Sequence, residues 1–130
     1  MSIPTNPYSS ESSLGVTAED KTLGLVAYIL AIFTSWLGPL ILWLVKKDQS
    51  KFVAFHALQA ALLMGAMTVL FIVLNILSIV GHIGFIAAAL EGILYLGTLV
   101  LNIIAALAAN KGDWYEMPVV GAYARKAAGL

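Results

Sequence analysis

The sequence predicts an all-α membrane protein: a bundle of three transmembrane helices followed by a C-terminal interfacial amphipathic segment. Only 11% of the 130 residues are charged and 61% are hydrophobic, with a mean hydropathy of +0.93. A soluble domain carries about 25% charged residues, and a chain this small could not bury so much apolar surface in a protein core. Apolar stretches long enough to cross a membrane occupy residues 22–45, 52–80 and 85–109.

These stretches divide the chain into three parts: a flexible polar N-terminal tail (1–20), a transmembrane helical domain (21–109) and a cytoplasmic interfacial tail (110–130). Within the N-terminal tail, Thr17 and Asp20 fit the pattern that caps the start of a helix. The tail lacks the basic region of a cleaved signal peptide. We therefore expect the first apolar stretch to remain in the protein as a signal anchor.

Gly38-Pro39 interrupts the first apolar stretch, and two interpretations follow. As one helix, residues 22–45 would span about 36 Å and cross the membrane once, with a kink near 34–35 where proline removes a backbone donor. The alternative is a re-entrant hairpin of two half-helices that turns between Ser35 and Pro39, where neighbouring helices would have to satisfy the turn. Trp36 lies too deep for an interface residue in a straight span, which favours the hairpin.

The polar loop 46–51 sets the orientation. With three crossings it shares one side with the C-terminus, and that side holds every basic residue except Lys21. The positive-inside rule then places it in the cytoplasm of a multi-pass protein of the cell (plasma or inner) membrane. The N-tail lies outside if residues 22–45 cross once and inside if they form a hairpin. Candidate residues for the inner interface and its lipid headgroups are Lys46, Lys47, Asp48, Lys51, His56, Gln59, Trp114, Arg125 and Lys126.

The second and third apolar stretches form a helical hairpin that turns at residues 81–84. Glu91, Tyr95, Thr98 and Asn102 fall within about 60° of one another on one helix face, a face that should avoid lipid. The antiparallel register pairs Asn75 with Glu91 and Thr68 with Thr98, so we expect hydrogen-bonded contacts at both positions. Three interpretations follow: these polar groups are interhelical contacts, Glu91 is a protonatable transport carboxylate, or Glu91 lies near the outer headgroups and has little role.

Ala57, Ala61 and Gly65 recur every four residues in the second stretch. Such a stripe of small residues allows another helix to approach closely.

Catalytic and cofactor signatures do not occur in this sequence. The chain has no cysteine, and it contains no HExxH, P-loop or Ser–His–acid arrangement. His56 and His82 lie at opposite ends of one expected helix and cannot share a metal ion. The net charge of zero gives no general attraction to nucleic acid. We therefore expect no enzyme activity, no cofactor, no metal and no nucleic-acid partner.

Three stretches together resemble a known family: residues 38–60, the apolar hairpin, and residues 109–126. They are similar to small prokaryotic membrane proteins of a domain-of-unknown-function family in the Tic-twenty-like superfamily, which is related to an import component of the chloroplast inner envelope. The resemblance implies an all-helical integral membrane protein without catalytic residues. The chloroplast relatives belong to a preprotein-conducting complex and have four crossings with both termini on one side, which raises the hairpin option. The matching residues are Gly38, Pro39, Lys46, Lys47, Asp48, Phe52, His56, Gln59, Asn110, Lys111, Gly112, Trp114, Tyr115 and Pro118.

The expected function is a non-enzymatic scaffold or subunit of a membrane assembly, with a role in protein translocation or envelope organisation. Its partners would be membrane lipids and either further copies of the chain, as a homo-oligomer, or other membrane proteins. The alternative is a small transporter or channel that uses the Glu91 stripe.

Overall fold

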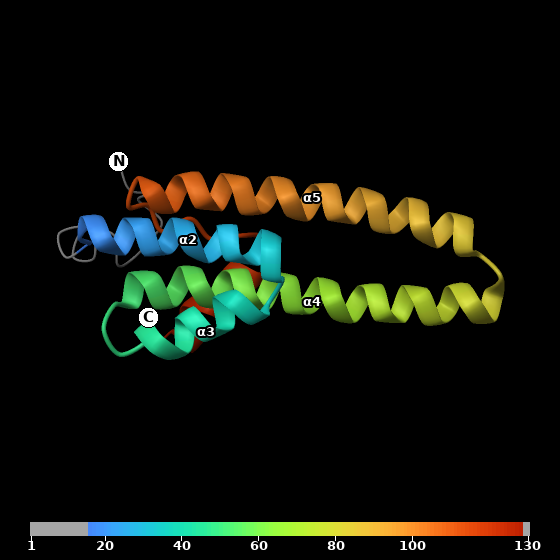
Figure 1. Cartoon of the computed structure of the whole chain (residues 1–130), viewed down its shortest axis with the longest axis horizontal. Coiled ribbons are helices and arrows are strands. Elements are labelled where there is room, and N and C mark those ends of the chain that lie inside the picture. The colour runs from blue at the N-terminus through green and yellow to red at the C-terminus, as the bar shows by residue number, and fades with distance from the viewer. Residues whose placement is uncertain (1–15, 129–130) are drawn as a thin grey trace.

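The computed structural model describes residues 16–128, and every element in that range is a helix (Figure 1). The order is α2 (Ala18–Thr34), α3 (Leu37–Lys46), α4 (Lys51–Gly81), α5 (Gly84–Asn110) and α6 (Val120–Ala127). The polar tail expected over residues 1–20 lies mostly outside the described residues. The capping pattern at Thr17 is confirmed: its hydroxyl accepts from the backbone N–H of Asp20, and the Asp20 carboxylate accepts from the N–H of Thr17.

The first apolar stretch is divided into two antiparallel helices. α2 ends at Thr34, Ser35 takes a positive φ of 60°, and α3 runs back in the opposite direction along the first half of α4 (Figure 1). Pro39 lies in the first turn of α3, where a helix has no use for its missing N–H. The Thr34 hydroxyl accepts from the N–H of Gly38 at 2.9 Å and so caps part of the new helix start. The single kinked span over 22–45 is therefore wrong, and the hairpin alternative describes the structure.

α4 and α5 form the long antiparallel hairpin expected from the sequence. They contain 31 and 27 residues, or about 46 and 40 Å at about 1.5 Å per residue. The turn between them depends on His82, which closes α4 in the left-handed conformation (φ 54°) while its N–H donates to the carbonyl of Ser78. Both helices are long and apolar enough to cross a membrane. The third expected transmembrane helix is not confirmed, because α2 and α3 are separate, shorter elements.

α2 lies between α4 and α5 at the end of the molecule that contains the polar loops (Figure 1). Gly24 makes the close packing possible: a Cβ atom there would lie 3.1 Å from Ala109 of α5 and 3.1 Å from the ring of Phe52 of α4. At the tip of the α2–α3 hairpin, Ser35 Oγ lies 3.4 Å from Thr68 Oγ1 of α4. Thr68 is about 20 Å from the far end of α4, so the hairpin covers little more than half of that helix.

Buried side chains concentrate at the end of the molecule that the α2–α3 hairpin covers. The core consists of the α2–α3 hairpin, the first half of α4, the last half of α5 and the C-terminal segment. Beyond the tip of the α2–α3 hairpin, no other helix of residues 16–128 lies over α4 and α5, and large apolar side chains are exposed. Ile79 is 76% exposed and Phe85 is 89% exposed.

The small-residue stripe of α4 is used within the chain. Ala57 and Ala61 are buried, and a Cβ atom on Gly65 would lie 3.9 Å from the Cβ of Trp36 in the hairpin. The helix that approaches the stripe therefore belongs to the same chain.

The C-terminal segment packs on the protein. α6 contacts α4, and its Gly121 and Ala124 are buried. A Cβ atom on Gly121 would lie 2.8 Å from Gln59 Oε1, so the helix backbone rests directly on α4. Its exposed face carries Tyr123 and Lys126. We expected this segment to lie on a lipid leaflet. The face with Gly121 and Ala124 instead packs on α4.

Candidate functional site

A fully buried group of three polar side chains joins α2 to α4. His56 and Gln59 lie three residues apart on α4 and so share one helix face, and Tyr28 faces them from α2. The Tyr28 hydroxyl lies 2.6 Å from His56 Nδ1, and Gln59 Nε2 donates to that hydroxyl at 2.7 Å. All three residues are fully buried. We call Tyr28, His56 and Gln59 the polar clamp.

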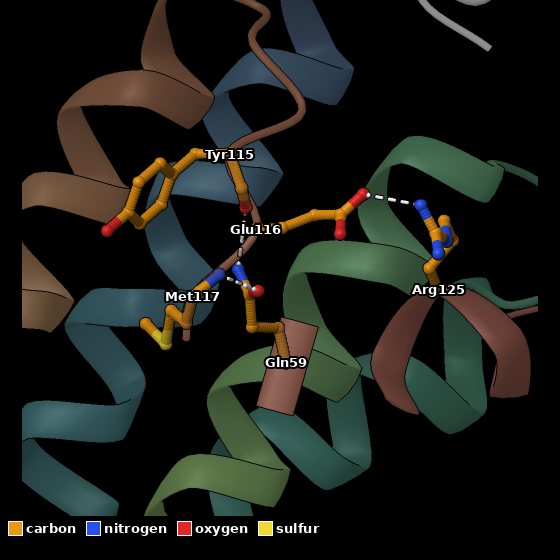
Figure 2. A network of polar contacts seen from close by, with 5 residues as sticks. All are labelled: Gln59, Tyr115, Glu116, Met117 and Arg125. Atoms are coloured by element: carbon orange, nitrogen blue, oxygen red, sulfur yellow. Dashed lines mark hydrogen bonds and ion pairs between the residues drawn. The ribbon is translucent and has the colours of Figure 1, made fainter. Parts of the chain in front are cut away.

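The polar clamp also holds the C-terminal segment through main-chain atoms. His56 Nε2 lies 2.9 Å from the carbonyl oxygen of Asp113. Gln59 donates to the carbonyl of Tyr115 at 2.9 Å and accepts from the N–H of Met117 at 2.6 Å. Figure 2 shows the Gln59 amide between these two backbone groups, with the Arg125–Glu116 ion pair (3.0 Å) beside it. Residues 113–117 are therefore bound to α4 as an extended strap.

The bonding pattern determines the tautomer of His56. A carbonyl oxygen can only accept, so Nε2 must carry the proton that binds Asp113. Nδ1 is then the acceptor for the Tyr28 hydroxyl, whose oxygen in turn accepts from Gln59. Each donor of the three side chains has a partner, which removes the penalty for burying them. The arrangement requires a neutral imidazole.

Aromatic rings enclose the imidazole. The ring centroid of His56 lies 4.5 Å from that of Phe52 and 5.0 Å from that of Phe55, both edge to face. Trp114, from the strap, packs against Phe52 at 5.2 Å. Such edge-to-face pairs contribute about 0.5–1.5 kcal/mol each beyond their buried area. The cage keeps water from the clamp and fixes the position of the strap.

This placement corrects part of the expected inner interface. His56, Gln59 and Trp114 are buried in the protein and cannot contact lipid headgroups. The lysines differ: Lys47, Lys51 and Lys126 are exposed. Arg125 is half-buried and pairs with Glu116. Contacts of the exposed lysines and Asp48 with headgroups stay a prediction.

Nearby, Lys46 donates to the side chain of Gln49 at 3.3 Å, and Lys47 lies over the ring of Trp43, 4.9 Å from its centroid. The loop 46–51 is thus partly ordered by its own side chains.

Tyr28 had no role in the sequence-based interpretation. It lies in an apolar run, where a tyrosine commonly packs as an aromatic side chain with its hydroxyl at an interface. The only available signal was that a hydroxyl inside an apolar helix needs a partner. The backbone partners at 113, 115 and 117 carry no side-chain signal at all.

The second group of predicted residues lies along the α4–α5 hairpin. The structure places Asn75 Nδ2 3.2 and 3.1 Å from the two carboxylate oxygens of Glu91, the contact expected from the hairpin register. Thr68 and Thr98 do not bond to each other, because each hydroxyl donates to a carbonyl of its own helix, Met64 and Leu94 respectively.

Asn102 is buried and donates to the carbonyl of Thr98 and to Met64 Sδ. Tyr95 is half-exposed, and its ring borders a cavity together with Thr68 and Thr98. The stripe is therefore partly buried by α2 and partly open, with Glu91 in the open part. Within residues 16–128, no three His, Asp or Glu side chains are placed to hold a metal ion.

The polar clamp explains how a short chain fixes a re-entrant hairpin and a C-terminal strap onto two long helices. Residues 19–123 match the magnetosome magnetite crystal formation protein family. The chain belongs to this family. The match begins in the first turn of α2 and ends within α6, so every clamp residue and the strap lie inside it.

Two archaeal relatives are described as UPF0132 membrane proteins. The chain is 30% identical to one from Methanocaldococcus jannaschii over 114 residues, which cover 88% of this chain and 91% of the relative. It is 29% identical to one from Archaeoglobus fulgidus over 111 residues, covering 85% and 97%. No solved structure matches the chain. These matches support a family of small membrane proteins, and the relation to the Tic-twenty-like superfamily stays a prediction.

Proposed function

We propose that this member of the magnetosome magnetite crystal formation protein family is a non-enzymatic scaffold or subunit of a membrane assembly. The proposal depends chiefly on one contrast. The side chains of the polar clamp form hydrogen bonds with one another and with the strap, while the far halves of α4 and α5 present uncovered apolar surface. A protein whose polar groups stabilise it and whose free surface is apolar is suited to docking within the bilayer.

In this proposal α4 and α5 cross the membrane, and the α2–α3 hairpin enters it without crossing. The hairpin tip at Ser35 meets Thr68, about 20 Å short of the far end of α4. Its own outer face is apolar, with Phe33 81% exposed. The hydrocarbon layer is about 30 Å thick, so a tip at this depth ends inside it.

The distribution of charge supports an orientation. The Lys and Arg residues lie in the first turn of α2, around the α3–α4 loop, directly after α5 and in α6, and the 81–84 turn has none. The start of α2, the α3–α4 loop and the end of α5 lie at one end of the molecule, opposite that turn (Figure 1). By the positive-inside rule this end faces the cytoplasm of a cell-membrane protein. The N-terminal start of α2 then lies on the cytoplasmic side as well.

A docking surface for the assembly is present on α5. Gly84, Ala88 and Gly92 recur every four residues, and all three are exposed. A Cβ atom on Gly92 would meet no atom within 4 Å. Small residues at this spacing allow a helix to approach closely inside a membrane. A second copy of the chain or another membrane protein would pack here, in a role in protein translocation or envelope organisation.

The experiment is crosslinking in native membranes followed by purification of the tagged full chain in mild detergent and mass spectrometry. We expect a partner, or a second copy, at constant ratio to the chain. Gly92→Leu should reduce its recovery, and Gly97→Leu, another glycine of α5 with open space, should not. Recovery of the monomer alone would contradict the proposal.

A second candidate is a small transporter or channel, favoured by the position of Glu91. Its carboxylate is bound to the exposed Asn75 about 10 Å from the 81–84 turn, within the expected hydrocarbon layer. Ionisable residues at such depth commonly mark ion or proton pathways. Proton or ion flux into liposomes that contain the protein should then fall in Glu91→Gln. An unchanged flux would exclude this function.

A further inference from the structure

The packing of α2 creates an opening between the two long helices. α2 separates α4 and α5 along much of their inner halves, although Asn102 Nδ2 still reaches Met64 Sδ at 3.5 Å, and the two helices contact each other again at Asn75 and Glu91. Between these points lie two cavities, of about 450 Å³ and about 610 Å³. Met67 and Thr98 border both, so the two cavities are neighbours, with these two side chains between them.

The two cavities differ in chemistry. The smaller one, under the hairpin tip, is bordered by aromatic rings and hydroxyl groups, among them Phe33, Phe71, Ser35 and Tyr95. The larger one is an open groove bordered almost entirely by aliphatic side chains, including Leu63, Ile93, Val100 and Leu101, with Gly97 in its wall; Ile93 and Val100 are exposed. One compartment therefore suits a flat ring with hydrogen-bonding atoms, and the other suits a hydrocarbon tail.

The hydroxyl groups that line the smaller cavity indicate that a molecule bound there would carry a hydrogen-bond acceptor. In the described part of the chain, the hydroxyls of Thr68 and Thr98 donate to backbone carbonyls, whereas the phenol of Tyr95 has no hydrogen-bond partner among residues 16–128. An unpaired O–H in an apolar environment is costly. A carbonyl oxygen on the occupant would accept from it.

Depth and charge exclude a phospholipid headgroup. The cavity residues Met64–Phe71 lie about 15–26 Å from the far end of α4, around the middle of a hydrocarbon layer of about 30 Å. No basic side chain borders either cavity. A charged headgroup would be neither solvated nor paired there.

We propose that the two neighbouring cavities together bind an uncharged, headgroup-free lipid with ring carbonyls and an apolar tail, the chemistry of a prenylquinone, which passes between Met67 and Thr98. The ring lies under the hairpin tip, where Tyr95 donates to a carbonyl, and the tail lies in the aliphatic cavity beside Gly97. The inference rests on the placement of α4 and α5 in the membrane and is independent of the scaffold role.

The test is equilibrium binding of decylubiquinone to the full chain in lipid nanodiscs, with diolein, which has ester carbonyls but no ring, as the second probe. We expect saturable binding of decylubiquinone and none of diolein. Tyr95→Phe keeps the ring and removes the donor, and it should weaken binding about fivefold, the effect of one hydrogen bond. Gly97→Leu should weaken binding at least about tenfold by occupying part of the tail groove.

Ala89→Leu is the matched control, because Ala89 lies on the same helix, is exposed and borders neither cavity. It should bind like the wild type. Equal binding by Gly97→Leu and Ala89→Leu would overturn the proposal, and so would saturable binding of diolein with the same variant pattern. Absence of decylubiquinone binding would also overturn it. Formation of a disulfide-linked dimer by Gly97→Cys that no longer binds the probe would overturn it too, because a second copy of the chain would then occupy the tail groove.

Discussion

The side-chain oxygen of Gln59 accepts a hydrogen bond of 2.6 Å from the backbone N–H of Met117, 58 positions later in the chain. The same amide also donates to Tyr28 of α2 and to the carbonyl of Tyr115. One side chain of α4 thus connects the re-entrant hairpin with the C-terminal strap. These two parts are far apart in sequence, and each depends on this residue for its position.

Replacing Gln59 by leucine should destabilise the protein by about 3 kcal/mol, because it leaves several buried backbone and hydroxyl groups without partners. The free energy of unfolding in mixed detergent micelles would measure this loss, and proteolysis after residue 110 should become faster. Gln49→Leu is the control, since Gln49 is exposed. If both variants were equally stable, the clamp would not hold the strap.

Tyr28→Phe should cost about 1.5 kcal/mol, because it removes the donor to His56 Nδ1 and the acceptor for Gln59. Nitrogen chemical shifts of the imidazole should show a neutral ring with the proton on Nε2 in the wild type. Tyr123→Phe is the control, because Tyr123 is 66% exposed. A proton found on Nδ1 in the wild type would contradict the bonding pattern.

Gly121→Ala should destabilise the packing of α6 by about 2 kcal/mol. A Cβ atom there would lie 2.7 Å from the Cβ and 2.8 Å from the Cα of Glu116, which cannot move without shifting the strap. Gly92→Ala adds the same methyl group to a helix in open space, so it should be neutral or slightly stabilising. Thermal unfolding of the two variants would compare them, and equal midpoints would mean that α6 is not seated on α4.

Labelling of single cysteines would establish the topology, because the natural chain has none. Cysteines at Glu19 and Asp48 should react with a membrane-impermeant maleimide only after the cells are opened. A cysteine at His82 should react in intact cells. Glu19 distinguishes the re-entrant hairpin from a single crossing by residues 22–45. Labelling of a cysteine there in intact cells would contradict the hairpin and indicate a single crossing.

Features that depend on neighbours in the chain could be predicted from the sequence. The cap at Thr17, the turn at 81–84 and the proximity of Asn75 and Glu91 all follow from local chemistry or from the register of one hairpin. The break near Ser35 was expected as well, but proline alone could not decide between a kink and a reversal. That choice depends on whether α4 offers a surface for α3 to pack on.

The burial of His56 and Gln59 could not be read from their positions. Polar residues near the start of a membrane helix commonly face the interface, and only the tertiary fold brings Tyr28 and the strap over them. The amphipathic pattern of residues 119–127 likewise suits a lipid surface or a protein surface. Its real partner is the first half of α4, with Gln59 beneath Gly121.

The partners of His56 and Gln59 within the strap are main-chain atoms of Asp113, Tyr115 and Met117. Amide and carbonyl groups are common to nearly all residue types, so substitutions at 113 and 115 can preserve the attachment as long as the path of the chain is unchanged. The imidazole and the carboxamide have no such freedom. Positions 113 and 115 of the strap should therefore tolerate many substitutions, because they bind through main-chain groups. His56 and Gln59 should tolerate few, because they bind through their side chains.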